Sequence, residues 1–268
     1  MVPRLYEGEQ AYVLQNVDGR VIFVIPFLDR FSLIGTTDVP FAGDPGEVRI
    51  DAGEVNYLCA AVNRYLARPV SPSDVVWSYA GVRPLYNDAQ ENPSAISREY
   101  VLELDDGGAG APLLSVIGGK ITAYRQVAEH AMEKLAPFYP GLDRPWTASA
   151  PLPGGDMPRA GFDPLLSRLK ERYPWLPDGL RRRLARAYGS LTETLLADAT
   201  SPEQLGRHFG GGLYEREVRW MLEREWAQTA DDVLWRRSKL GLYLSPQERD
   251  GLAAWLEAGG SGSAREQA

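Results

Sequence analysis

The stretch SVIGGKITAYRQVAEHAMEKL, residues 115–135, decides how the first part of the chain folds. It begins as an apolar, strand-like segment, and Gly118, Gly119 and Lys120 then lead directly into a segment with helical periodicity. The apolar positions of that segment fall on one stripe, which predicts an amphipathic helix: Ile121, Tyr124, Val127, Ala128, Ala131, Met132 and Leu135. A strand that turns at glycines into a helix presents free backbone N–H groups and the positive end of the helix dipole. The sequence therefore predicts an anion-binding geometry at this turn.

Lys120 adds a full positive charge and three hydrogen-bond donors at the same turn. These would suit a phosphate, or negative charge that develops on a cofactor ring. The alternative is a tight turn with a solvated lysine, and the residues alone leave both interpretations open. The spacing does not match the phosphate-binding loop G-x-x-x-x-G-K-[ST].

Upstream of this turn the chain is typical of an antiparallel sheet. QAYVLQNV and RVIFVIPF are β-rich runs separated by Asp18-Gly19, a hairpin signal, and FSLIGTTDV follows as a third strand. Residues 51–67 have helical periodicity, and further strands are expected in residues 74–86, 94–104 and 112–118. The first part is therefore predicted to be a mostly antiparallel sheet with two helices.

The character of the chain changes after residue 136. Residues 137–163 are rich in proline and glycine and are predicted to form a linker. Residues 164–258 carry mainly helical patterns, with capping-box spacing at Thr229/Asp232 and at Ser245/Glu248. The prediction is an α+β chain: a partial substrate and cofactor domain in residues 1–136, a small all-α domain in 164–258, and a disordered tail in 259–268.

Composition excludes several classes of protein. The net charge of −7 and the absence of a basic run with interleaved aromatics argue against nucleic-acid binding. Residues 1–163 hold 13 Lys and Arg against 21 Asp and Glu, so a cation that binds an anion there must be placed locally. One cysteine builds neither a disulfide framework nor a zinc site; Cys59 falls on an apolar helical face and is expected to be a buried thiol, and no metal is expected. With no signal peptide or spanning segment apparent, the expected compartment is the cytoplasm.

Two arginines join Lys120 as candidates. Arg83 ends a predicted strand in SYAGVRPL, and Arg98 lies within another in ISREYVL. Each is either structural or part of a clamp for phosphate or carboxylate. Thr36, in the polar turn IGTTDV, either lines a pocket or belongs to an ordinary turn. The two histidines are expected on the surface, His130 on the polar side of its helix and His208 in a short helix.

Five ordered motifs resemble the carboxy-terminal portion of the bacterial aerobic FAD-dependent glycerol-3-phosphate dehydrogenase family. They are residues 2–39, VVWSYAGVRPL, SVIGGKITAYRQVAEHAMEKL, LPGG and ADDVLWRRSKLGLYL. The resemblance implies a flavoenzyme that oxidises glycerol 3-phosphate to dihydroxyacetone phosphate and passes electrons to membrane quinone. It implies catalytic roles for Lys120 and Arg83, substrate contacts from Arg83, Arg98, Lys120 and Thr36, and flavin contacts from Gly118, Gly119, Lys120, Ile121 and Thr122.

The sequence departs from the family at the motif that binds the ADP half of FAD. Members carry a G-x-G-x-x-G fingerprint for the ADP half of FAD, whereas GGAGAP at residues 107–112 lacks the third glycine. We therefore expect most of the FAD site to lie outside this chain and the polypeptide alone to be inactive. The partners implied are a complementary FAD-binding chain or a second copy, and peripheral contact with the inner membrane. Two alternatives stay open: a stand-alone binding or assembly module, and a related FAD-linked amine or amino-acid oxidase.

Overall fold

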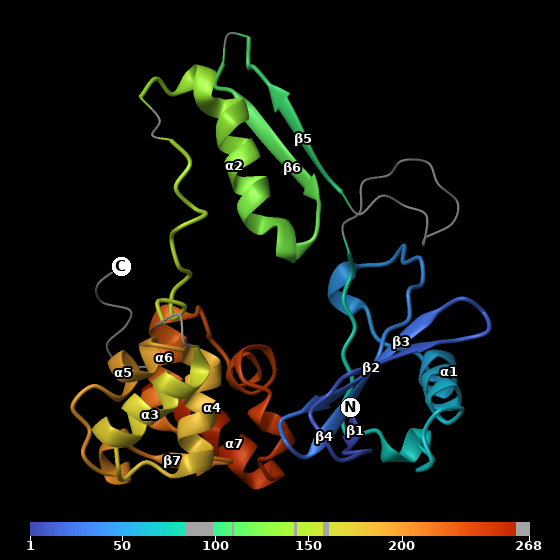
Figure 1. Cartoon of the computed structure of the whole chain (residues 1–268), viewed down its shortest axis with the longest axis vertical. Coiled ribbons are helices and arrows are strands. Elements are labelled where there is room, and N and C mark those ends of the chain that lie inside the picture. The colour runs from blue at the N-terminus through green and yellow to red at the C-terminus, as the bar shows by residue number, and fades with distance from the viewer. Residues whose placement is uncertain (84–98, 109, 142–143, 158–160, 261–268) are drawn as a thin grey trace. The chain divides into compact units, whose positions relative to one another are not determined.

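The computed structural model describes residues 1–83, 99–108, 110–141, 144–157 and 161–260 (Figure 1). The chain divides into two compact units, Met1–Ala148 and Ser149–Ala268, and each is considered separately. The predicted linker boundaries, 137 and 163, are not tested by this division and stay predictions.

The first unit begins with a four-stranded antiparallel sheet in the order β1-β4-β3-β2. Its strands are β1 (Val2–Pro3), β2 (Tyr12–Gln15), β3 (Val21–Phe27) and β4 (Phe31–Gly35). The predicted hairpin turn is confirmed, since Gly19 adopts φ +80° between paired β2 and β3 and its N–H donates to the Asn16 carbonyl at 3.0 Å. The meander predicted from the sequence is therefore present.

Helix α1 (Ala52–Val62) packs on one side of this sheet. Leu14, Ile22 and Val24 of the strands form a core with Leu58, Ala61 and Val62 of the helix. Cys59 is buried beside Val2 and Val70, as expected, and burial raises the pKa of its thiol. A thiol in that state is a poor nucleophile, which agrees with a packing role.

Helix α1 ends earlier than the sequence pattern predicts, at Val62 rather than at residue 67. The cause lies in the side chain of Asn63, which donates to the Val70 carbonyl at 2.8 Å and accepts from the Val70 N–H at 2.7 Å. Side-chain hydrogen bonds of this kind draw the backbone away from continued helix. The chain consequently turns back over the end of the helix at this point.

The strand expected in residues 74–86 does not form in its described part. Residues 72–74 make a short 3-10 turn, η2 (Pro72–Asp74), and residues 75–83 have no regular structure. Two backbone contacts hold this segment to the start of the chain: the Val76 N–H donates to the Met1 carbonyl, and the Met1 amino group donates to the Trp77 carbonyl, each at 2.9 Å. Another short 3-10 turn, η1 (Pro45–Glu47), precedes α1.

Residues 115–135 fold as predicted, from strand through turn to helix. Strands β5 (Tyr100–Asp105) and β6 (Leu113–Gly118) form an antiparallel hairpin, and η3 (Ile121–Ala123) leads into α2 (Tyr124–Leu135) and η4 (Ala136–Phe138). Figure 1 shows α2 lying alongside the hairpin. No residue of β5, β6 or α2 is buried, so this part of the unit has no closed core.

The second unit is mainly helical and encloses one large apolar core. Its elements are α3 (Phe162–Arg172), α4 (Asp178–Tyr188), α5 (Leu191–Leu196), η5 (Pro202–Leu205), β7 (His208–Gly210), β8 (Leu213–Tyr214), α6 (Glu215–Arg224), η6 (Asp232–Arg237), η7 (Leu240–Leu242), α7 (Pro246–Trp255) and η8 (Leu256–Gly260). The α+β class is thus confirmed, with antiparallel sheets in the first unit and helices in the second.

The second unit differs from the prediction at one hairpin. His208 was expected in a helix and lies in β7, because Gly210, Gly211 and Gly212 all take positive φ and turn the chain into β8. The His208 Nε2 accepts from the Gly212 N–H at 3.3 Å, and its ring packs on Tyr214. These contacts give His208 a structural role within the hairpin.

A buried charged network crosses the second unit. Both oxygens of Glu217, which is 3% exposed, accept from Arg183 at 2.7 Å, and Tyr188 donates to the same carboxylate at 2.9 Å. The pKa of Tyr188 is raised by burial and by the negative charge of Glu217. All three groups therefore satisfy one another inside the core.

The LPGG motif has a packing explanation. A Cβ built on Gly154 would lie 2.4 Å from the Tyr188 carbonyl oxygen, and one on Gly189 would lie 2.0 Å from the Gly154 carbonyl oxygen. The two backbones approach this closely because the Ser190 N–H donates to the Gly154 carbonyl at 3.1 Å. Only glycine fits at either position.

No helix within the described ranges has the length and apolar character needed to cross a membrane. No group of three or more His, Cys, Asp or Glu side chains in the same ranges is arranged to hold a metal ion.

The two predicted capping boxes are present. Ser245 and Glu248 exchange hydrogen bonds at the start of α7, and the Asp232 carboxylate accepts at 3.0 Å from the N–H groups of Gln228 and Thr229. Chiefly because of the Gln228 N–H, the pKa of Asp232 falls to about 2. A carboxylate that is stabilised in the folded state in this way contributes stability above its unfolded pKa and loses it as the pH falls through the folded value.

Replacing Asp232 should therefore destabilise the protein in a pH-dependent manner. We expect D232A to lower the free energy of unfolding by about 1 kcal/mol at pH 7, and the difference from wild type to disappear as the pH falls from about 4 to about 2. Urea denaturation followed by tryptophan fluorescence at several pH values measures this. The neighbouring exposed Asp231 supplies the control: D231A should leave stability nearly unchanged, and a D232A defect that persists at pH 2 would contradict the prediction.

Candidate functional site

The turn between β6 and α2 has the geometry of an anion site. Gly118 and Gly119 take φ values of +72° and +90°, a conformation that favours glycine at both positions. A Cβ on Gly119 would also lie 3.0 Å from the Tyr100 Cβ, so a larger residue there would have to displace Tyr100. No side chain caps the start of η3 or of α2. The structure records no acceptor for the N–H groups of Ile121 and Thr122 within the described ranges, whereas the Ala123 N–H donates to the Lys120 carbonyl at 2.9 Å.

The side chains at this turn face solvent. Lys120, Ile121 and Thr122 are all exposed, Ile121 at 89%. Within the described residues, the structure records no hydrogen bond or ion pair for the Lys120 ammonium group. The structure thus brings Gly118 through Thr122 together on one open turn with a positive charge, which can bind an anionic group.

A second group of predicted residues lies at the end of β4. Thr36 is exposed and its hydroxyl donates to the Thr37 carbonyl at 2.9 Å, while the Arg83 Nη1 contacts the two carboxylate oxygens of Asp38 at 3.1 and 3.2 Å. The loop of residues 36–38 and the segment that ends at Arg83 therefore meet. Arg98 lies outside the described residues, so its position in this group stays a prediction.

The loop is held to the start of α1 by Glu54. The Thr37 hydroxyl donates to Glu54 Oε1 at 2.5 Å, and Glu54 Oε2 accepts from the Asp51 N–H at 3.1 Å. The Glu54 N–H in turn donates to the Asp51 carboxylate at 2.7 Å. A capping box thus serves also as the anchor of the loop. No recorded hydrogen bond or ion pair in the described ranges joins this loop to the Lys120 turn.

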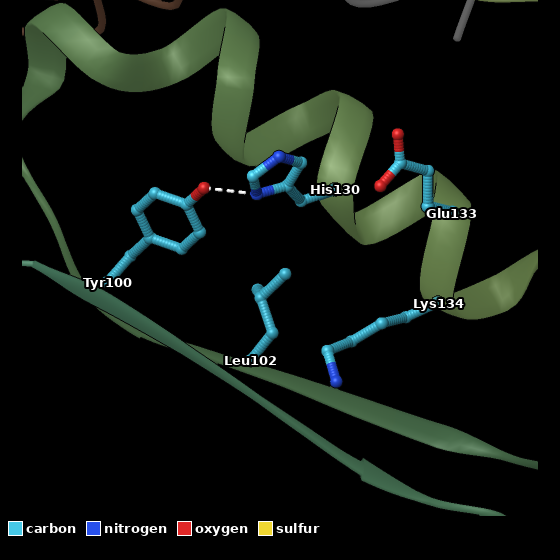
Figure 2. Close-up of a pocket in the computed structure, with 5 residues that line it drawn as sticks. All are labelled: Tyr100, Leu102, His130, Glu133 and Lys134. Carbon is cyan, nitrogen blue, oxygen red and sulfur yellow. Dashed lines mark hydrogen bonds between the residues drawn. The ribbon is translucent and has the colours of Figure 1, made fainter.

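A cavity of about 480 Å³ opens between the hairpin and α2, lined by Tyr100, Leu102, His130, Glu133 and Lys134 (Figure 2). The Tyr100 hydroxyl and His130 Nδ1 form a hydrogen bond across it, while Leu102 contributes an apolar surface from the strand. Charged side chains of α2 stand at its rim.

This cavity corrects the expectation that His130 is a surface residue. His130 is partly buried and is paired with Tyr100. A signal was present in the sequence, since His130 lies three residues after Val127 and seven after Ala123, on the side of α2 that carries partly buried residues. The partner on β5 could not be read from that spacing, because it depends on how the helix packs on the hairpin.

Apolar side chains surround the same region and are exposed. Beside Ile121, the exposed members are Val116 at 52%, Tyr124 at 51% and Met132 at 45%, whereas Leu113, at 63%, lies on the opposite face of β6 from Val116. We call Val116, Ile121, Tyr124 and Met132 the apolar surface of the hairpin and α2. Exposed apolar groups gathered on neighbouring elements mark a surface that binds another molecule or segment.

The motif DDVLWRRSKLG, by contrast, has a packing role. Val233 and Leu234 are buried in the core of the second unit. Arg237 Nε donates to the Glu225 carbonyl at 2.7 Å, and the Lys239 ammonium donates to the Trp235 carbonyl. Arg237 and Lys239 therefore donate to backbone carbonyls near the ends of α6 and η6.

Comparison with known proteins gives two family matches and several close relatives. Residues 2–125 match the model of the FAD dependent oxidoreductases, and residues 145–255 match that of the C-terminal domain of alpha-glycerophosphate oxidase. The chain is 46% identical over 256 residues to the aerobic glycerol-3-phosphate dehydrogenase of Escherichia coli, with 96% of this chain and 51% of that protein covered.

Two further relatives have comparable identities. The glycerol-3-phosphate dehydrogenase of Pseudomonas aeruginosa is 49% identical over 258 residues, covering 96% of this chain and 50% of that protein. The D-erythritol 1-phosphate dehydrogenase of Brucella abortus is 45% identical over 257 residues, covering 96% of this chain and 51% of that protein. The chain is therefore a homologue of the glycerol-3-phosphate dehydrogenases, within the FAD-dependent oxidoreductase family, and spans about half the length of the curated relatives it matches.

Proposed function

We propose that this chain supplies the substrate-binding side and the flavin-facing turn of an enzyme that oxidises sn-glycerol 3-phosphate to dihydroxyacetone phosphate. The electrons would pass through FAD to a membrane quinone. The observation that carries this proposal is the open, positively charged turn at Gly118 to Thr122, which lies within the region that matches FAD-dependent oxidoreductases.

The residues of the turn fit one part of FAD. FAD, when bound, would accept the hydride removed from C2 of the substrate, and negative charge builds on the flavin's pyrimidine edge as it does so. The uncapped N–H groups at Ile121 and Thr122 and the ammonium group of Lys120 would stabilise that charge. Gly118 and Gly119 would allow the ring to come close to the backbone. The ADP half of FAD would need groups that this chain does not supply.

Arg83 would bind the phosphate of the substrate. The Arg83 side chain is 48% exposed, and its guanidinium group contacts Asp38 through Nη1. The edge that does not contact Asp38 can therefore form two parallel hydrogen bonds with a phosphate. Arg98 and Thr36 would complete the phosphate site, and Lys120 would lie between it and the flavin.

The apolar surface of the hairpin and α2 would bind a complementary FAD-binding region. The relatives are about twice as long as this chain, and β5, β6 and α2 contain no buried residue. Packing of a further layer against Val116, Ile121 and Met132 would bury apolar area and close the cavity at His130. We expect the 268-residue chain to show no activity without that region.

A second substrate has specific support. The D-erythritol 1-phosphate dehydrogenase is 45% identical to this chain, against 46% for the Escherichia coli enzyme. Both named substrates are polyol phosphates, so the phosphate site would serve either, and the choice would depend on the residues that surround the polyol chain. The assay below therefore uses both compounds.

Lys120 can be tested in a fusion enzyme, in which this chain follows the part of the Pseudomonas aeruginosa relative that it does not match. We expect the fusion enzyme to bind FAD and to reduce an artificial quinone with sn-glycerol 3-phosphate faster than with D-erythritol 1-phosphate. K120A should lower kcat/KM by about 10²- to 10³-fold through loss of charge stabilisation. Lys170, exposed on α3, provides the matched control, since K170A should stay within about twofold of wild type.

Two results would count against this assignment. One is a K120A enzyme that retains FAD and full kcat/KM. The other is oxidation of sn-glycerol 3-phosphate by the 268-residue chain purified alone, which would show that no complementary region is needed.

The apolar surface can be tested by separating the two parts of the fusion enzyme. When they are expressed as two polypeptides, V116D should weaken their association at least about tenfold, because a charge would be buried in an apolar contact. Val17 is 91% exposed on the β2–β3 turn, so V17D introduces the same charge as a control and should leave association unchanged. Equal affinities for V116D and wild type by isothermal titration would exclude this surface as the contact.

A further inference from the structure

The contact between Arg83 and Asp38 has an arrangement suited to positioning. Both carboxylate oxygens of Asp38 approach a single nitrogen, Nη1, at 3.1 and 3.2 Å. Within the described ranges, the contact with Asp38 is the one that the structure records for Arg83. That contact does not involve the Nε and Nη2 atoms of Arg83. One edge of the guanidinium group is thereby held, and another is left to face a ligand.

Asp38 is itself fixed from the side of α1. Its neighbour Thr37 is bound to Glu54 at 2.5 Å, and Glu54 belongs to the capping box with Asp51. A continuous series of polar contacts therefore runs from the first turn of α1 through the loop to the Arg83 side chain. The last contact of the series joins Asp38 to Arg83, which are 45 positions apart in the sequence.

The ion pair cannot be explained by stability alone. The two side chains are 48% and 41% exposed, and exposed pairs of this kind contribute little to the free energy of unfolding. An arginine side chain that is already oriented, however, loses less conformational freedom when it binds an anion. The arrangement is therefore better matched to binding than to folding.

An opposing effect must be weighed. The negative charge of Asp38 also repels a phosphate and competes with it for the guanidinium group. Solvent and salt screen that repulsion because both groups are exposed and the phosphate would bind on the far edge of the guanidinium group, whereas the contacts to Nη1, at hydrogen-bond distance, are screened less. Orientation should therefore dominate.

From this geometry we infer that Asp38 is a positioning residue, which orients the Arg83 guanidinium group for the phosphate of the substrate and is held in place by Thr37 and Glu54. This inference rests on the proposed function. It assigns Asp38 an action on the substrate through Arg83, without direct contact.

The steady-state kinetics of the fusion enzyme with sn-glycerol 3-phosphate test the inference. We expect D38A to raise KM about 5- to 20-fold and to change kcat by less than about twofold, since only the placement of the phosphate-binding group is lost. D38N keeps one acceptor oxygen and should raise KM less than D38A does. Glu47 forms a comparable exposed ion pair with Arg49, so E47A serves as the control and should leave KM unchanged.

A double-mutant cycle separates positioning from a general structural role. If Asp38 acts through Arg83, D38A should change KM by less than about twofold in an R83A background. Full additivity of the two substitutions, or a KM that is unchanged or lowered in D38A, would overturn the inference while leaving the proposed function intact. An FAD-loaded fusion enzyme that does not oxidise sn-glycerol 3-phosphate would overturn the proposed function and this inference together.

A second measurement covers a fusion enzyme that fails to bind FAD. The Arg83 Nε–Hε signal in the NMR spectrum of the 268-residue chain can be followed as inorganic phosphate is added. Wild type should saturate at a phosphate concentration about 5- to 20-fold below that needed by D38A. Equal titration curves for the two proteins would refute the inference in this case also.

Discussion

Two strands and one helix cannot enclose a hydrophobic core, and this constraint governs the part of the chain that carries the proposed flavin-facing turn. β5, β6 and α2 carry the Lys120 turn, yet none of their residues is buried. A hairpin of this size is marginally stable in water unless a further layer packs on it. The hairpin and α2, which would face the flavin, would therefore be stabilised by the same contact that brings the flavin to them.

The rest of the chain does not share this dependence. The second unit closes its own core and pairs its buried charges, with Glu217 held by Arg183 and Tyr188. The sheet β1–β4 and α1 also share a core, which fixes the loop that leads to Asp38. We propose that these parts act as stable supports, and that the site is completed where the hairpin and α2 meet a complementary region.

Features that depend on neighbouring residues could be predicted from the sequence, and contacts between distant residues could not. The Asp18-Gly19 turn, the Ser245 cap and the strand-to-helix turn before Lys120 follow from local backbone preferences. The pairings of Tyr100 with His130 and of Arg83 with Asp38 join residues 30 and 45 positions apart. Their partners are set by the packing of one element on another, which a single sequence does not reveal.

We propose that this chain provides the phosphate side of a polyol-phosphate site and a wall of the flavin site. A crystal structure of the FAD-loaded fusion enzyme with sn-glycerol 3-phosphate is the sharpest test. Phosphate oxygens are expected within hydrogen-bond distance of Arg83, and the flavin's pyrimidine edge against the N–H groups that follow Lys120. A phosphate bound away from Arg83, or a flavin that does not contact the Lys120 turn, would contradict the proposal.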